Sequence, residues 1–273
     1  LEAVGAEAFR GTSLTTLPAM PALRRIGAGA FRGCQRLARI EIPETVERIG
    51  DAAFYECPAL WSVTYNAADA ACSRSMFDRS IGRIVLGDRV RRLPAGLFTG
   101  NDGLTEVTLP QSVETIDAAA FYNCVNLRSV RLPEGVTAIG DEAFAHCRAL
   151  ASLHWPLRLT SVGYHAFFDC EALTTVSLPE GVERVGECAF YGCRGLERLY
   201  IASTVRTIGE GAFELFNGDR SGFTVTCAAA EPPAYYWSNG NAPAVVKVPA
   251  GALEKYRADG NWRGAGNTFT AIG

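Results

Sequence analysis

This sequence holds little that points to catalysis or to charge-driven binding. Histidine occurs only three times, and the formal net charge is −3. A chain without a basic excess gives no electrostatic case for binding nucleic acid or an anionic membrane. No run of about 18 apolar residues is present, so the sequence contains no candidate membrane-spanning helix.

The common motifs of hydrolases, nucleotide-binding proteins and zinc proteases are also missing. No G-x-S-x-G, P-loop or H-E-x-x-H pattern occurs. The histidines, His146, His154 and His165, form no Cys/His set with the spacing of a zinc site. We therefore predict a protein that is not an enzyme, has no catalytic residues and carries no metal or cofactor.

What the sequence has instead is a repeat. The 23 residues from Leu127 to Ala149 follow the template L-x-x-V-x-L-P-x-x-V-x-x-I-G-x-x-A-F-x-x-C-x-x. Repetition at a fixed period of this size is typical of a solenoid, in which each repeat forms one rung of a stack. Further copies begin at Leu14, Leu37, Leu104, Leu150 and Leu173, and looser copies at Leu60, Ile81 and Leu196.

The template itself predicts the shape of a rung. With its Leu as position 1, apolar positions 4 and 6 alternate with polar positions 3 and 5, as in a half-buried strand. Positions 10 and 13 indicate a second extended segment, and Gly at position 14 is expected to supply a corner with positive φ. Ala and Phe at positions 17 and 18 should fill the interior. Stacking about nine rungs would give a rod roughly 45 Å long.

Six of the nine cysteines occupy one template position. Equivalent residues on neighbouring rungs lie about 4.8 Å apart with parallel side chains, which does not suit a disulfide. We therefore predict a ladder of buried, reduced thiols. Cys188 and Cys193 share a rung, and a bridge between them stays open. The ladder residues are Cys34, Cys57, Cys124, Cys147, Cys170 and Cys193.

The repeats predict how the chain is divided. Residues 1–218 form the solenoid, with a partial repeat at 1–13 and irregular rungs at 60–103, whose variable residues should bulge outward as a loop. Because the chain opens inside a repeat, we expect further residues or another domain before Leu1. Residues 219–273 should form a C-terminal cap, with a strand at 246–248 and a short helix at 249–257.

The template resembles the BspA-like leucine-rich repeats of bacterial surface proteins, over about residues 4–216. The segment V-P-A-G-A-L-E-K-Y, from Val248 to Tyr256, also looks like the cap of that family. The resemblance implies a right-handed, leucine-rich-repeat-type β-rich solenoid with a parallel sheet. It also implies a secreted or cell-surface location in a bacterium and adhesion to host matrix proteins or other cells. It does not imply one particular ligand.

The predicted binding face is the solvent side of the strands, where positions 3 and 5 project. Trp, Tyr and Arg supply most binding hot spots, so Arg131, His154, Arg198 and Tyr200 form the best candidate cluster. The alternative is a solvated polar face without a ligand. The full set of candidate residues is Arg39, Glu41, Arg83, Glu106, Arg131, His154, Arg198 and Tyr200.

Two aromatic groups offer other candidates. Tyr55, Tyr122, Phe168 and Tyr191 follow the Phe position and either bind a ligand or shield the edges of the rungs. Tyr235, Tyr236 and Trp237 either form a sugar-stacking platform or pack the cap.

We thus predict a non-catalytic module that binds an extracellular protein. The alternatives are a carbohydrate-binding or spacer domain of a larger nutrient-acquisition protein, and a purely structural stalk. A glycan partner fits the first alternative, whereas nucleic acid and a membrane span fit none of these functions.

Overall fold

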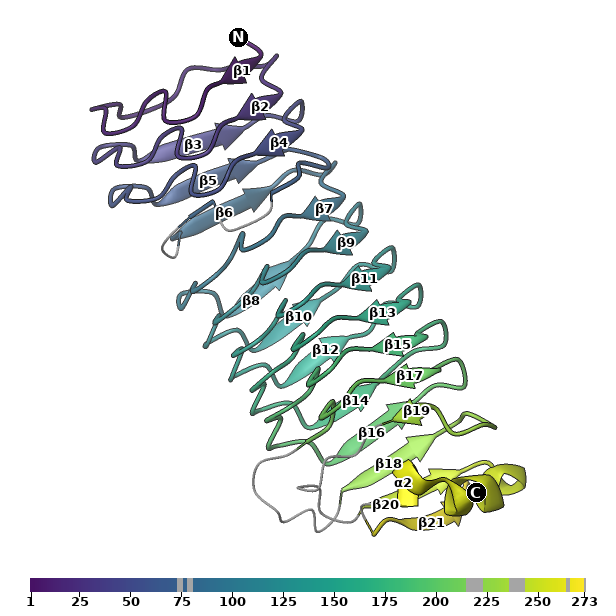
Figure 1. Cartoon of the computed structure of the whole chain (residues 1–273). Helices are drawn as coiled ribbons and strands as arrows, with labels where there is room; N and C mark the ends of the chain where they lie inside the picture. The colour runs from purple at the N-terminus through teal and green to yellow at the C-terminus, as the bar shows by residue number, and fades with distance from the viewer. Residues whose placement is uncertain (73–75, 78–80, 215–222, 236–243, 264–265, 273) are drawn as a thin grey trace.

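The protein is a long stack of parallel strands (Figure 1). The structure, a computed structural model, describes residues 1–72, 76–77, 81–214, 223–235, 244–263 and 266–272. The chain winds through about eleven turns, with its N-terminus at one end of the stack and the C-terminal helices at the other. This confirms the predicted leucine-rich-repeat-type solenoid.

Each regular rung contributes one longer and one shorter strand, on two sides of the stack. The longer strands are β3 (Arg39–Ile42), β5 (Ser62–Tyr65), β6 (Arg83–Leu86), β8 (Glu106–Thr108), β10 (Ser129–Arg131), β12 (Ser152–His154), β14 (Thr175–Ser177), β16 (Arg198–Ile201), β18 (Thr224–Cys227), β20 (Val245–Val248) and β21 (Thr268–Ala271). The shorter strands are β1 (Ala3–Val4), β2 (Arg25–Ile26), β4 (Arg48–Ile49), β7 (Arg92–Leu93), β9 (Thr115–Ile116), β11 (Ala138–Ile139), β13 (Ser161–Val162), β15 (Arg184–Val185), β17 (Thr207–Ile208) and β19 (Ala234–Tyr235).

The register of the strands follows the period of the sequence. In β10 and β12, Ser129 lies opposite Ser152, one 23-residue repeat later. Each template position therefore packs against its own copies on the two neighbouring rungs. The rung count exceeds the predicted nine because β18, β19, β20 and β21 continue both sheets beyond residue 218, where the template is no longer recognisable.

The C-terminal segment closes the last rung with small helices. These are η1 (Ala250–Ala252), α1 (Leu253–Ala258) and α2 (Gly260–Arg263). Tyr256 of α1 and Trp262 of α2 are buried, and Trp262 donates its indole N–H to the carbonyl oxygen of Pro233 at 2.9 Å. The predicted strand and short helix are thus present, although β21 rather than β20 ends the sheet.

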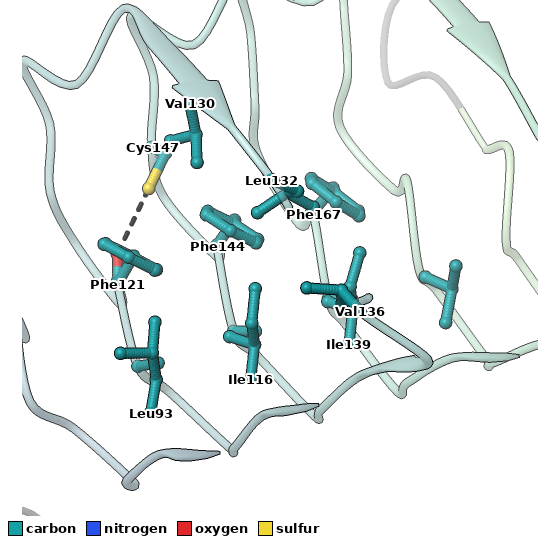
Figure 2. Close-up of a cluster of buried hydrophobic side chains, with 14 of the residues drawn as sticks. Leu93, Ile116, Phe121, Val130, Leu132, Val136, Ile139, Phe144, Cys147 and Phe167 are labelled. Carbon is teal, nitrogen blue, oxygen red and sulfur yellow. Dashed lines mark hydrogen bonds between the residues drawn. The ribbon is translucent and has the colours of Figure 1, made fainter. Parts of the chain in front are cut away.

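A column of phenylalanine rings runs through the core (Figure 2). Phe121 and Phe144 stack with their ring centroids 4.9 Å apart, and Phe144 and Phe167 are 5.2 Å apart. The rings are nearly parallel because the rungs repeat by translation. Ala143 and Ala166 beside them are fully buried, as predicted for positions 17 and 18.

The glycine at position 14 does not have the predicted positive φ. Left-handed backbone occurs instead at positions 16 and 20, on residues such as Glu142 and His146. Glycine is needed at position 14 because the backbones of neighbouring rungs approach each other closely there. A Cβ on Gly186 would lie 2.5 Å from the carbonyl carbon of Gly163. The role of this glycine is close approach, not turn geometry.

Part of the irregular centre packs inward. Ala67, Ala70 and Met76 are completely buried, and so is Tyr65, whose large ring occupies position 6. The predicted outward loop is therefore wrong for residues 66–72; residues 73–75 and 78–80 lie outside the described part of the chain.

Hydrogen-bond pairing between the longer strands is interrupted twice. In the described residues, no pairing joins β6 to β8 or β12 to β14. At the second break, the ring of Trp155 packs against Phe167 and Phe190, with centroids 5.4 and 6.2 Å away. At the first break, a hollow of about 380 Å³ is lined by residues including Ile84, Leu86 and Val107.

Candidate binding surface

The strands carry the predicted polar columns on their solvent face. In β3 and β16, exposed residues alternate with buried ones, so positions 3 and 5 project outward. The register aligns Arg39, Ser62 and Arg83 in one column, and Glu41, Thr64 and Val85 in the next. The two interruptions in strand pairing divide this face into three patches. The N-terminal patch contains β3, β5 and β6, the middle patch contains β8, β10 and β12, and the C-terminal patch contains β14, β16, β18, β20 and β21.

The N-terminal patch contains an exposed arginine–tryptophan pair. The guanidinium of Arg39 lies over the ring of Trp61, 5.1 Å from its centroid, and Trp61 is 43% exposed. Arg39, Glu41 and Arg83 line a shallow hollow of about 490 Å³ on this face. A cationic and an aromatic group beside a hollow are typical anchors for a ligand.

Trp61 is not in the sequence-based set, which contains only residues at positions 3 and 5. It occupies position 2, where the other repeats carry Thr, Ala, Gly, Arg or Glu. A single large aromatic residue in a column of small or polar ones was the available signal.

The middle patch brings two predicted residues together. Arg131 and His154 are register partners on β10 and β12, and Glu106 lies one rung earlier on β8. His154 is engaged with Glu134, whose carboxylate oxygen lies 2.7 Å from its Nε2 atom. This hydrogen bond is the main cause that holds the pKa of Glu134 below its ordinary value.

Arg198 and Tyr200 lie on β16, beyond the second break. Arg198 donates a hydrogen bond to the Thr175 hydroxyl at 3.2 Å, and its guanidinium lies 3.4 Å from the carboxylate of Glu197. Tyr200 is 38% exposed. The four residues expected to cluster therefore lie in two patches, separated by the gap between β12 and β14.

The C-terminal aromatic candidates do not form an exposed platform in the described residues. Tyr235 is only 1% exposed and packs on Trp262 and Phe213, so it belongs to the packing of the cap. Tyr236 and Trp237 lie outside the described residues.

The second aromatic group is half-buried along the edge of the rungs. Phe168 stacks on Tyr191 with ring centroids 5.2 Å apart. His146 sits edge-on between Tyr122 and Phe168, at 5.4 and 5.3 Å. These contacts favour a shielding role over a binding role.

The cysteine ladder is built from hydrogen-bonded thiols. All nine cysteines are free, including Cys188 and Cys193, so the structure contains no bridge between that pair. Each ladder thiol donates to the Phe carbonyl oxygen of the preceding rung; for Cys147 the acceptor is Phe121, at 3.1 Å (Figure 2). Burial raises the pKa of Cys170 well above its ordinary value, which keeps this thiol protonated and a poor nucleophile.

The described residues form neither a metal site nor a membrane-spanning helix. No group of three or more His, Cys, Asp or Glu side chains is arranged to hold a metal ion. No described helix has the length and apolar character needed to cross a bilayer.

Comparison with known proteins agrees with the architecture. The family profile described as "BspA type Leucine rich repeat region" matches residues 2–128 and 91–218, with six copies. No curated protein gives a significant match.

Solved structures include several similar leucine-rich repeat proteins. The pneumococcal vaccine antigen PcpA has a TM-score of 0.60 and 17% identity, covering 100% of this chain and 71% of that one. A leucine-rich cell surface protein from Faecalibacterium prausnitzii A2-165 has a TM-score of 0.44 and 21% identity, covering 88% and 84%. A leucine-rich repeat protein from T. pallidum has a TM-score of 0.41 and 29% identity, covering 72% of each chain. With the family profile matched over residues 2–218, this chain belongs to the BspA-type leucine-rich repeat family.

Proposed function

We propose that this chain is a non-catalytic binding module of a bacterial cell-surface or secreted protein. Its ligand is an extracellular protein, belonging to host matrix or to a neighbouring cell. Membership of the BspA-type family and the names of the similar structures, which include a cell surface protein and a vaccine antigen, support this proposal.

The observation that carries the proposal is the Arg39–Trp61 pair on the N-terminal strand patch. An indole left 43% exposed on a folded protein contributes apolar area that a partner can bury. Arg39 holds the ring from one side, and the adjacent hollow of about 490 Å³ offers room for a partner side chain. We therefore propose that the ligand makes its primary contact here and a second contact with Arg131 of the middle patch and Arg198 of the C-terminal patch.

The test is binding of the purified chain to immobilised fibronectin, fibrinogen and a glycan panel. One variant carries Arg39→Ser and Trp61→Ser, and a second carries Arg131→Ser, Arg198→Ser and Tyr200→Ser. Arg24→Ser is the matched control, because this exposed arginine pairs with Glu47 away from the strand face.

We expect saturable binding to a protein surface, weakened at least about tenfold by the first variant, which corresponds to a loss of about 1.4 kcal/mol. The control should bind like the wild-type chain. Retained protein binding in both strand-face variants would overturn the proposed site. Binding to glycans alone would favour the carbohydrate-binding alternative, and no binding at all would favour a spacer.

A further inference from the structure

A third hollow lies on the other side of the stack, along the shorter strands. Its volume is about 770 Å³, within the size range of ligand sites. Arg25 on β2, Arg48 on β4 and Arg92 on β7 line it, and Gly27 and Gly50 contribute backbone without a side chain. It is formed by different strands from the face proposed above.

Arg25 and Arg48 lie directly opposite each other in the register of β2 and β4. Like charges in this arrangement destabilise a sheet. In the part of the chain that the structure describes, no carboxylate lies within ion-pair distance of either guanidinium. By contrast, Arg24 pairs with Glu47, and Arg92 lies 3.0 Å from the Asp117 carboxylate. Two exposed arginines are thus left adjacent and unneutralised.

The same side of the stack has the opposite charge in its C-terminal half. There, a hollow of about 630 Å³ is lined by one arginine, Arg184, and two glutamates, Glu187 and Glu210. The N-terminal hollow has three arginines against two aspartates. In a chain whose net charge is −3, the positive character of the N-terminal hollow is local. The two hollows are built from equivalent template positions but differ in charge.

We propose that the Arg25–Arg48 hollow binds an acidic, extended segment of a protein partner, with one carboxylate held between the two guanidinium groups. Arginine presents a planar fork that binds a carboxylate through two hydrogen bonds. Neighbouring strands are about 4.8 Å apart, so one carboxylate reaches both side chains. A single ion would leave most of the hollow empty, whereas an extended acidic segment can fill it.

The inference shares only the class of ligand, a protein, with the proposed function and uses none of the strand-face residues. The experiment measures fluorescence anisotropy of a labelled peptide with alternating Glu and Ala, titrated with the purified chain at low and high salt. A peptide with Gln at every Glu position is the matched probe. The variants are Arg25→Gln/Arg48→Gln and, as control, Arg184→Gln in the C-terminal hollow.

We expect the Glu peptide to bind and the Gln peptide to bind at least about tenfold more weakly, because the ligand is recognised by its charge. The double variant should lose the same factor, Arg184→Gln should not, and high salt should weaken binding. Thermal melting should show the double variant to be as stable as the wild-type chain or more so, because a repulsive pair is removed.

Equal binding of both peptides, or full binding by the double variant, would overturn the proposal. Inorganic phosphate that binds the same arginines as tightly as the peptide would overturn the peptide occupant. The Arg39→Ser/Trp61→Ser variant should bind the Glu peptide normally. A failure of the strand-face proposal is therefore distinguishable from a failure of this one.

Discussion

The thiol of Cys147 donates a hydrogen bond to the backbone carbonyl oxygen of Phe121, with sulfur and oxygen 3.1 Å apart (Figure 2). That oxygen also accepts the backbone N–H of Cys124 at 3.2 Å. The oxygen therefore accepts one hydrogen bond from its own rung and a second from the next rung, and the buried thiol also fills space in the core. One residue type satisfies both requirements, which explains why cysteine recurs at this template position.

Replacing Cys147 by alanine should cost about 1–2 kcal/mol of unfolding free energy, from a lost hydrogen bond and a small cavity. Cys188→Ala is the control, because Cys188 is only partly buried and lies outside the ladder; it should change stability by less than about 0.5 kcal/mol. Urea titration of both variants measures the difference. Equal losses would contradict a special role for the ladder.

Substitution of the glycine at position 14 should lower the free energy of unfolding more than substitution of the ladder cysteine. Gly186→Ala places a Cβ 2.5 Å from backbone atoms of the preceding rung, which cannot move without shifting the stack. We expect a loss of about 3 kcal/mol or more, the upper range for overpacking. In Gly135→Ala the nearest atom is the Val113 carbonyl oxygen at 3.5 Å, an ordinary contact. That variant should lose less than about 1 kcal/mol, and similar losses in both would contradict the close-approach explanation.

The architecture could be predicted because a solenoid relates neighbours by a constant offset in sequence. Ser129 lies beside Ser152 for the same reason that the template recurs after 23 residues. Burial of Phe144 and Cys147 follows from that offset together with the apolar character of the columns.

The departures could not be predicted because each depends on packing between particular side chains. Trp155 packs on Phe167 and Phe190 at an interruption in strand pairing, and Tyr65 fills a buried position where the template has leucine. The strands after residue 218 pair through backbone hydrogen bonds, which tolerate a change of side chains. Trp61 occupies template position 2, where the other repeats carry only small or polar residues, so the template does not predict a binding residue there.

The Phe column should contribute strongly to stability. Phe144 is fully buried between Phe121 and Phe167, so Phe144→Ala should cost about 3–5 kcal/mol. Phe168→Ala removes a half-buried ring of the same size outside the column and should cost clearly less. Denaturant titration of the two variants tests this. A loss below about 1 kcal/mol for Phe144→Ala would contradict its place in the core.

Stability should also depend on the protonation of His165. Its ring stacks on Tyr164, with centroids 3.8 Å apart, and packs on Phe168 at 4.7 Å. Burial is the main cause that lowers the pKa of His165 below its ordinary value. The folded protein therefore binds this proton less tightly than the unfolded chain does. Its neutral form favours folding above about pH 6.5, and that contribution declines as the pH falls below this value.

His165→Asn isolates this effect, because asparagine tolerates the positive φ of 52° at this position. We expect the melting temperature of the wild-type chain to fall between about pH 7.5 and about pH 5.5, and the fall to be smaller in the variant. Both proteins keep the carboxylates that titrate at lower pH, so the difference between their pH slopes comes from the histidine. Identical pH slopes would show that the surrounding carboxylates of Glu142 and Glu187 offset the burial of the ring.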